Sequence, residues 1–121
     1  QMCIRDRNEL KVRLFDEVKE LLSDFTKTDE YLDYLCSKIR EAARFADGEE
    51  MTIYISPSDK EKQTELEKRT GMTITISEYD FMGGMRAVIR GRNILIDHSF
   101  QAAVDYEYHQ FSFAAGGAGI E

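Results

Sequence analysis

The first part of the chain carries apolar residues spaced three and four apart, a pattern that predicts an amphipathic helix over residues 8–25. Charged residues fill the opposite face. The stripe runs almost to the start of the predicted domain without a convincing cap, so we expect this helix to be the stump of a longer one. The apolar positions are Leu10, Leu14, Phe15, Val18, Leu21, Leu22 and Phe25.

A second helix is predicted to follow almost at once. Thr28 can accept a hydrogen bond from the first free N–H groups, and Asp29 and Glu30 suit the positive end of the helix dipole. Gly48, after Asp47, is a plausible stop. The apolar face of this helix consists of Tyr31, Leu32, Leu35, Ile39, Ala42 and Ala43.

Alternation of apolar and polar residues then predicts four strands. Between the first two, Ser58 and Glu61 have the spacing of a capping box, which predicts a short polar helix that Gly71 ends. Gly91 and Asn93 are suited to positive φ and predict a turn between the last two strands. The predicted strands lie at residues 51–56, 72–78, 85–90 and 94–97.

The last predicted helix begins at Asp97 or Ser99, either of which can cap it. The order is helix, helix, strand, helix, strand, strand, strand, helix. This order predicts an α+β fold with a small mixed or antiparallel sheet of about four strands, covered on one side by helices. The face of the last helix carries Phe100, Val104, Tyr108 and Phe111.

The sequence also predicts where the domain begins and ends. Residues 1–7 show no clear period and are interpreted as a non-native or truncated leader. Residues 8–111 form the predicted domain. Residues 112–121 are rich in glycine, and we expect a flexible tail there.

Composition narrows the function classes. The net charge of −7 argues against binding to a nucleic-acid backbone as the main activity. Because the sequence has no apolar run near the roughly 20 residues that a bilayer helix needs and no secretory leader, a cytoplasmic setting is the default. Cys3 and Cys36 are far apart and suggest neither a disulfide framework nor a metal site; Cys36 is interpreted as a core residue.

Two short motifs are candidates for chemistry. A phosphate cradle needs glycines that open a helix, whereas Gly83 and Gly84 precede a strand, so the pair is interpreted as a bend or bulge. Asp97, His98 and Ser99 are adjacent and cannot form a nucleophilic relay among themselves, so capping is the preferred interpretation. We therefore predict no catalytic, cofactor-binding or metal-ligating residue.

The charged side chains suggest little chemistry either. Acidic residues on the helices, among them Asp59 and Glu65, are expected to face water. Arg86 and Arg90 are predicted to share one strand face, with Arg92 at the turn. Such a cluster is usually a solvated face, and its functional interpretation is a contact for an acidic partner surface.

Several segments in this order resemble the C-terminal domain of the E subunit of V-type (archaeal/vacuolar-type) ATP synthases. The resemblance covers roughly residues 8–111. It is carried by "LKVRLFDEVKELLSDF", "EYLDYLCSKIREA", "IYISPSDKE" and "FMGGMRAVIRGRNILIDHSFQAAV". Family members also have a long charged N-terminal helix, which is missing from this sequence. The residues that match the family pattern are Gly83, Gly84, Asp97, Ser99 and Phe100.

The resemblance implies a stator, the peripheral stalk that holds the ATP-hydrolysing head against rotation, and not an enzyme. The implied partners are the B subunit of the head and a G-type stalk subunit, with no nucleic acid and no direct membrane insertion. The protein would be cytoplasmic and associated with the membrane through the complex. The predicted partner surface is Arg86, Arg90 and Arg92, with Leu10 and Leu14 facing the stalk.

Two alternatives stay open. One is a stator-like adaptor of a flagellar or type III export ATPase, which has a similar general architecture. The other is a small ligand-binding or hydrolytic enzyme that uses Asp97, His98 and the glycine turn.

Overall fold

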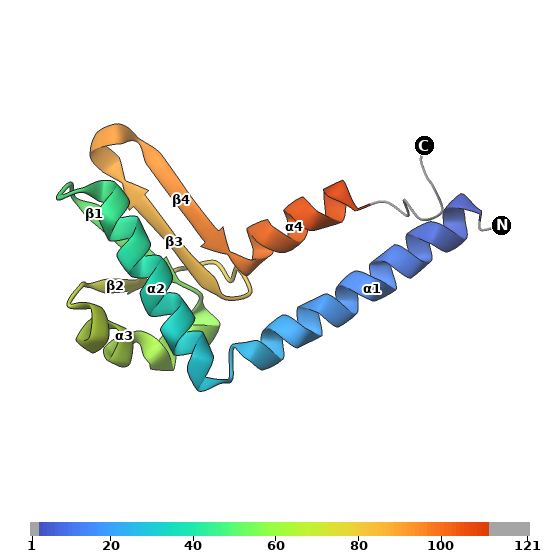
Figure 1. Cartoon of the computed structure of the whole chain (residues 1–121), viewed down its shortest axis with the longest axis horizontal. Coiled ribbons are helices and arrows are strands. Elements are labelled where there is room, and N and C mark those ends of the chain that lie inside the picture. The colour runs from blue at the N-terminus through green and yellow to red at the C-terminus, as the bar shows by residue number, and fades with distance from the viewer. Residues whose placement is uncertain (1–2, 112–121) are drawn as a thin grey trace.

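The computed structural model describes residues 3–111, and within them four α-helices accompany a four-stranded mixed sheet (Figure 1). The predicted α+β class and order of elements are confirmed. The tail predicted at 112–121 lies outside the described residues. The elements are α1 (Ile4–Phe25), α2 (Asp29–Ala46), β1 (Met51–Ile55), the 3-10 helix η1 (Pro57–Lys62), α3 (Gln63–Thr70), β2 (Ile74–Ile76), β3 (Gly84–Ile89), the 3-10 turn η2 (Arg90–Arg92), β4 (Ile94–Ser99) and α4 (Phe100–Gln110).

The sheet has the strand order β2-β1-β3-β4. β1 runs parallel to β2 and antiparallel to β3, and β3 runs antiparallel to β4. Ile53 lies between Ile74 and Ala87 in this register, and all three side chains are buried. Because side chains alternate across a strand, these residues define the face that packs on the helices.

Helices α2 and α3 cover that inner face. Tyr31, Leu35 and Ile39 of α2 are fully buried, and Leu66 of α3 packs in the same core cluster. Cys36 is buried beside them, as its apolar context predicted. The opposite sheet face is only partly covered, with Tyr54, Arg86, Val88 and Leu95 at its centre.

Helix α1 extends away from the sheet beside α4 (Figure 1). It begins at Ile4, four residues before the predicted start, and the Cys3 sulfur accepts a weak hydrogen bond from the Asp6 N–H at 3.4 Å. Phe15 is the one buried residue of α1, and its ring meets those of Tyr108 and Phe111 edge to face. Of the predicted apolar stripe, Leu14 and Leu21 are the residues that the described part of the chain leaves exposed.

Two predicted helix starts, at Thr28 and Ser58, are wrong in detail. Thr28 is the N-cap residue of α2, but its hydroxyl donates to the Phe25 carbonyl at 2.7 Å and accepts no hydrogen bond from the first N–H groups of the helix. Ser58 caps no helix, because Pro57 starts a 3-10 turn and α3 begins only at Gln63. The predicted helix ends are confirmed, because Asp47 and Gly48 have positive φ after α2 and Gly71 has positive φ after α3. In the β3–β4 turn, Asn93 has positive φ and Gly91 does not.

Candidate interaction site

The Gly83-Gly84 pair forms the bend that leads into β3. Both residues have positive φ, 119° and 79°, a region that favours glycine. A side chain on Gly84 would also place its Cβ 2.2 Å from the His98 carbonyl oxygen. The close approach of β3 to β4 therefore requires glycine at this position.

The backbone N–H groups of this bend already have protein acceptors. The Ser56 hydroxyl oxygen accepts from the N–H groups of Phe81 and Gly83, at 3.0 and 3.2 Å. The Tyr31 hydroxyl oxygen accepts from the Gly84 N–H at 2.8 Å. These bonds turn the donors inward, so the bend does not present them to an anion.

Asp59 is buried, 2% exposed, and the expectation that it faces water is wrong. The 3-10 turn directs its carboxylate inward, where it accepts a hydrogen bond from the Tyr31 hydroxyl at 2.5 Å. Lys62 neutralises it through an ion pair of 3.1 Å. Burial, followed by the hydrogen bond to Asp59 and the charge of that carboxylate, raises the pKa of Tyr31 far above its ordinary range.

The side chains of Asp97, His98 and Ser99 do not converge on one site. Ser99 is the N-cap of α4, and its hydroxyl oxygen accepts from the Ala102 N–H at 3.1 Å. Asp97 accepts from the Ser99 N–H at 2.9 Å. His98 points to the helix-covered face of the sheet, where its Nε2 lies 3.8 Å from a Glu41 oxygen of α2.

Asp97 also pairs with Arg86 across the open sheet face, with Nε and Oδ1 3.3 Å apart. Partial burial would raise the pKa of Asp97. The hydrogen bonds from Ser99 and the charge of Arg86 outweigh that effect and lower the pKa below its usual range. This pair is thus a structural contact between β3 and β4.

The three hairpin arginines occupy different surroundings. Arg86 lies on β3, with its guanidinium 4.7 Å from the centre of the Phe81 ring. The prediction that Arg90 shares a strand face with Arg86 is wrong, because β3 ends at Ile89 and Arg90 opens the turn. Arg92 is held by an ion pair with Glu49 at 2.9 Å.

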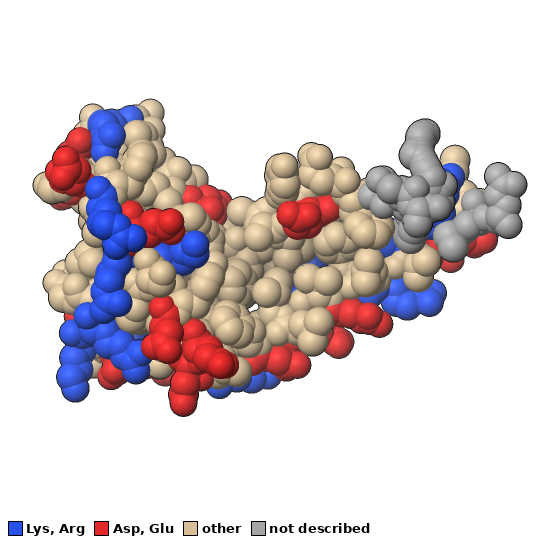
Figure 2. All heavy atoms as spheres, viewed as in Figure 1, with Lys and Arg blue, Asp and Glu red and all other residues tan. Residues whose placement is uncertain are grey.

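Further basic residues lie on α2 and α3. Figure 2 shows Lys and Arg side chains gathered along one edge of the molecule, over the β3–β4 turn, α2 and the end of α3. Arg40 and Arg44 of α2 and Lys68 and Arg69 of α3 are exposed on these elements. The spacing of four between Arg40 and Arg44 is the sequence signal that could have indicated this basic edge.

The predicted stalk-facing leucines differ in exposure. Leu10 is half-buried, whereas Leu14 is 38% exposed. Leu21, one heptad beyond Leu14, is 69% exposed. The two exposed leucines share a helix face that the described residues leave uncovered.

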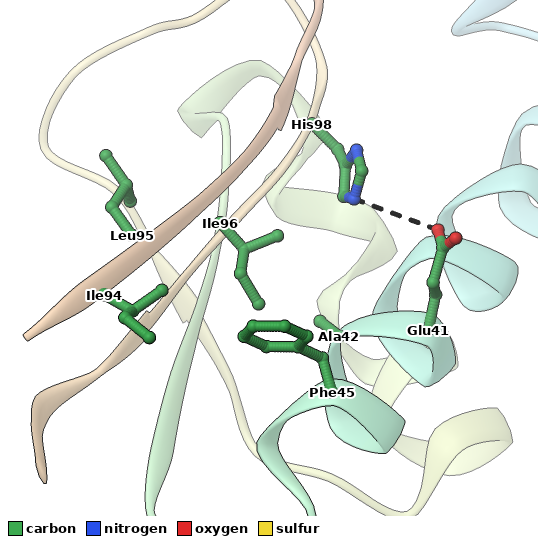
Figure 3. Close-up of a pocket in the computed structure, with 7 residues that line it drawn as sticks. All are labelled: Glu41, Ala42, Phe45, Ile94, Leu95, Ile96 and His98. Carbon is green, nitrogen blue, oxygen red and sulfur yellow. Dashed lines mark ion pairs between the residues drawn. The ribbon is translucent and has the colours of Figure 1, made fainter. Parts of the chain in front are cut away.

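A shallow apolar hollow of about 360 Å³ lies between α2 and β4 (Figure 3). Phe45 of α2 and Ile94 and Ile96 of β4 point toward one another across it. The Glu41 and His98 pair closes one end. Sequence reasoning missed this feature, although an exposed Phe45 near the end of an amphipathic helix is a recognisable signal.

Other chemical features are scarce in the part of the chain that the structure describes. No group of three or more His, Cys, Asp or Glu side chains there could hold a metal ion. None of the described helices combines the length and apolar character needed to cross a bilayer. The basic edge, the exposed leucines of α1 and the hollow between α2 and β4 are therefore the surface features that remain to be assigned a role.

Comparison with known proteins finds that this chain is similar to E subunits of A-type and V-type ATP synthases. No family model matches the chain. The E subunit of the A-type ATP synthase of Saccharolobus islandicus is 31% identical over 96 residues, which cover 77% of this chain and 48% of that protein. The corresponding protein of Pyrobaculum neutrophilum is 25% identical over 91 residues, covering 75% and 48%. A V-type ATP synthase E subunit of Clostridium tetani, numbered 2 in that organism, is 24% identical over 91 residues, covering 74% and 46%.

These relatives confirm the resemblance to the E subunit of A-type and V-type ATP synthases. The chain spans about half the length of the curated relatives it matches.

Proposed function

We propose that this chain is part of the peripheral stalk of a V-type or A-type ATP synthase and holds the ATP-hydrolysing head against rotation. The observation that carries the proposal is its similarity to E-subunit proteins over 77% of its length. In this role the chain is a non-catalytic part, located in the cytoplasm and attached to the membrane only through the complex. Its partners are the B subunit of the head and a G-type stalk subunit.

The shape of α1 supports a stalk role. Its 22 residues span about 33 Å, and Figure 1 shows it leaving the sheet as a long arm. Leu14 and Leu21 lie one heptad apart on an uncovered face. That spacing suits pairing with a second helix, so we assign this face, with Leu10 beside it, to the G-type subunit.

The junction between α1 and the sheet supports a load-bearing role. The Phe25 ring at the end of α1 lies 5.6 Å from Tyr31, 6.0 Å from Tyr34 and 6.4 Å from Phe100. Tyr31 is tied in turn to Asp59 and to the glycine bend. Packed rings and hydrogen bonds from separate segments resist bending better than a flexible linker would.

The basic edge supports a contact with an acidic surface of the head. Arg90 is exposed, and no ion pair to it occurs among the described residues, so its charge is available. Arg86 and Arg92 remain part of the proposed surface, but each already has an acidic neighbour. We therefore expect Arg90 to contribute most to attraction of the head at low salt.

The proposal is tested by assembling the parent complex with and without this chain. A part that resists rotation is needed to couple ATP hydrolysis to ion movement, yet ATP cleavage does not require it. We expect complexes that lack the chain to hydrolyse ATP but to lose ion pumping. In a direct binding assay the isolated B subunit should bind the chain, and the catalytic head subunit serves as the comparison. Unchanged pumping without the chain, or no binding to the B subunit, contradicts the proposal.

A further inference from the structure

The two edges of the sheet differ in how far side chains protect their outward-facing backbone groups. At the β2 edge, Gln63 donates to the Ile74 carbonyl at 2.7 Å, and the Glu67 carboxylate accepts from the Ile74 N–H at 2.9 Å. β2 is also only three residues long. This edge is thus short and protected by side chains of α3, which are common defences against unwanted strand pairing.

The β4 edge lacks comparable protection in the described residues. β4 is twice as long, Ile94–Ser99, and ends the strand order. Among the described residues, the hydrogen bond from the Ser99 N–H to the Asp97 carboxylate is the one side-chain hydrogen bond to the backbone of β4.

The hydrogen-bond pattern shows which backbone groups of β4 face outward. Gly84 and Ser99 are register partners, yet the Gly84 N–H donates to Tyr31 and the Ser99 N–H to Asp97. They therefore form a non-hydrogen-bonded pair. Antiparallel pairs alternate, so Asp97 and Leu95 also turn their N–H and C=O groups away from β3.

Apolar side chains flank this edge on both faces of the sheet. On the open face Leu95 is 58% exposed, beside Val88. On the helix face Phe45 is 53% exposed and lies over Ile94 and Ile96 (Figure 3). An added strand would bury apolar surface on both sides while it pairs with the free backbone groups.

We propose that β4 receives an extended segment of a head subunit as a fifth strand of the sheet. This inference rests on the proposed function. The basic β3–β4 turn, with Arg90, lies at the Ile94 end of the edge, and Glu41 lies at the His98 end. The segment that fits carries apolar residues at alternate positions, an acidic residue beside Arg90 and a basic residue beside Glu41.

Leu95→Pro tests the backbone role directly. Proline removes the outward N–H of residue 95, and the hydrogen bonds between β3 and β4 come from the alternate residues, so the sheet is retained. Leu95→Ala is the matched control, because it shortens the same side chain and keeps the N–H. The probe is the isolated B subunit, and circular dichroism checks that both variants fold.

We expect Leu95→Pro to weaken B-subunit binding about tenfold or more, and Leu95→Ala by no more than about threefold. In the unaltered chain, the Leu95 and Asp97 amides should exchange hydrogen quickly alone and become protected when the B subunit is added. Equal binding of the two folded variants, or no protection of these amides in the complex, overturns the strand inference and leaves the proposed function standing. Absence of B-subunit binding by the unaltered chain overturns both.

Discussion

Replacing Tyr31 with phenylalanine removes one oxygen atom from the centre of the domain and leaves the ring in place. That oxygen donates to buried Asp59 at 2.5 Å and accepts from the Gly84 N–H at 2.8 Å. Tyr31 is fully buried, so water does not readily replace either partner. Asp59 keeps its ion pair with Lys62, whereas the Gly84 N–H loses its acceptor.

The expected cost follows from these two bonds. A hydrogen bond to a charged group contributes about 1.5–3 kcal/mol, and a buried donor left unsatisfied costs about 1–3 kcal/mol. Because the retained Lys62 pair offsets part of the first loss, we expect Tyr31→Phe to lower the free energy of unfolding by about 3 kcal/mol. That is a large share of the roughly 5–15 kcal/mol typical of a whole domain.

Urea unfolding followed by circular dichroism measures this loss. With an m-value of about 1–3 kcal/mol per molar, the urea midpoint should fall by roughly 1–3 M without a change in m. Tyr34→Phe is the matched control, because Tyr34 packs beside Tyr31 but is only half-buried. A Tyr31→Phe loss below about 1 kcal/mol, or one equal to that of Tyr34→Phe, would refute the assigned hydrogen-bond role.

Three further predictions concern the glycine bend, the α4 cap and the Asp97 carboxylate. Gly84→Ala should lower the free energy of unfolding by about 3 kcal/mol or more, because the new Cβ meets a β4 carbonyl oxygen. Gly48→Ala is the control: Gly48 also has positive φ but lies in open space, so this change should lower the free energy of unfolding by about 1 kcal/mol. The two variants are compared by their urea midpoints. Ser99→Ala should cost about 1 kcal/mol through loss of the cap, and Ser58→Ala close to nothing; equal effects in thermal unfolding would contradict the assigned caps. Because the folded-state pKa of Asp97 is lowered, its contribution is present above its ordinary pKa and is lost as pH falls through the lowered value. Asp97→Asn should therefore make the free energy of unfolding fall less steeply below about pH 4. The same pH dependence of stability in the variant and the unaltered chain would contradict this role of Asp97.

The fold could be predicted from the sequence because its signals are local. The alternation in 51–56 and the spacing of Tyr31, Leu35 and Ile39 each identify an element and its buried face. Helix stops at Gly48 and Gly71 depend on a single residue's φ preference. Signals of this kind do not require knowledge of which segments meet in space.

The surroundings of individual polar residues were harder to predict, because they depend on distant partners. The helical pattern around Asp59 predicts a water-facing side chain, yet its hydrogen-bond partner Tyr31 lies 28 residues earlier in the chain. Alternation continues through Arg90 and predicts a strand residue there, whereas the strand ends one residue earlier. The free edge of β4 is likewise a property of strand order, which periodicity does not encode.

Tyr31, which stabilises the domain through its hydrogen bonds, also packs against the end of α1 and so helps to hold the direction of that helix. Only residues 26–28 separate α1 from α2, so bending of the arm at this connection would disturb the packing of the Phe25 ring against the Tyr31 and Tyr34 rings. Tyr31 itself is fixed by hydrogen bonds to two further segments, η1 and the start of β3. In the proposed stator, a sideways load on α1 would therefore spread into the sheet through Tyr31.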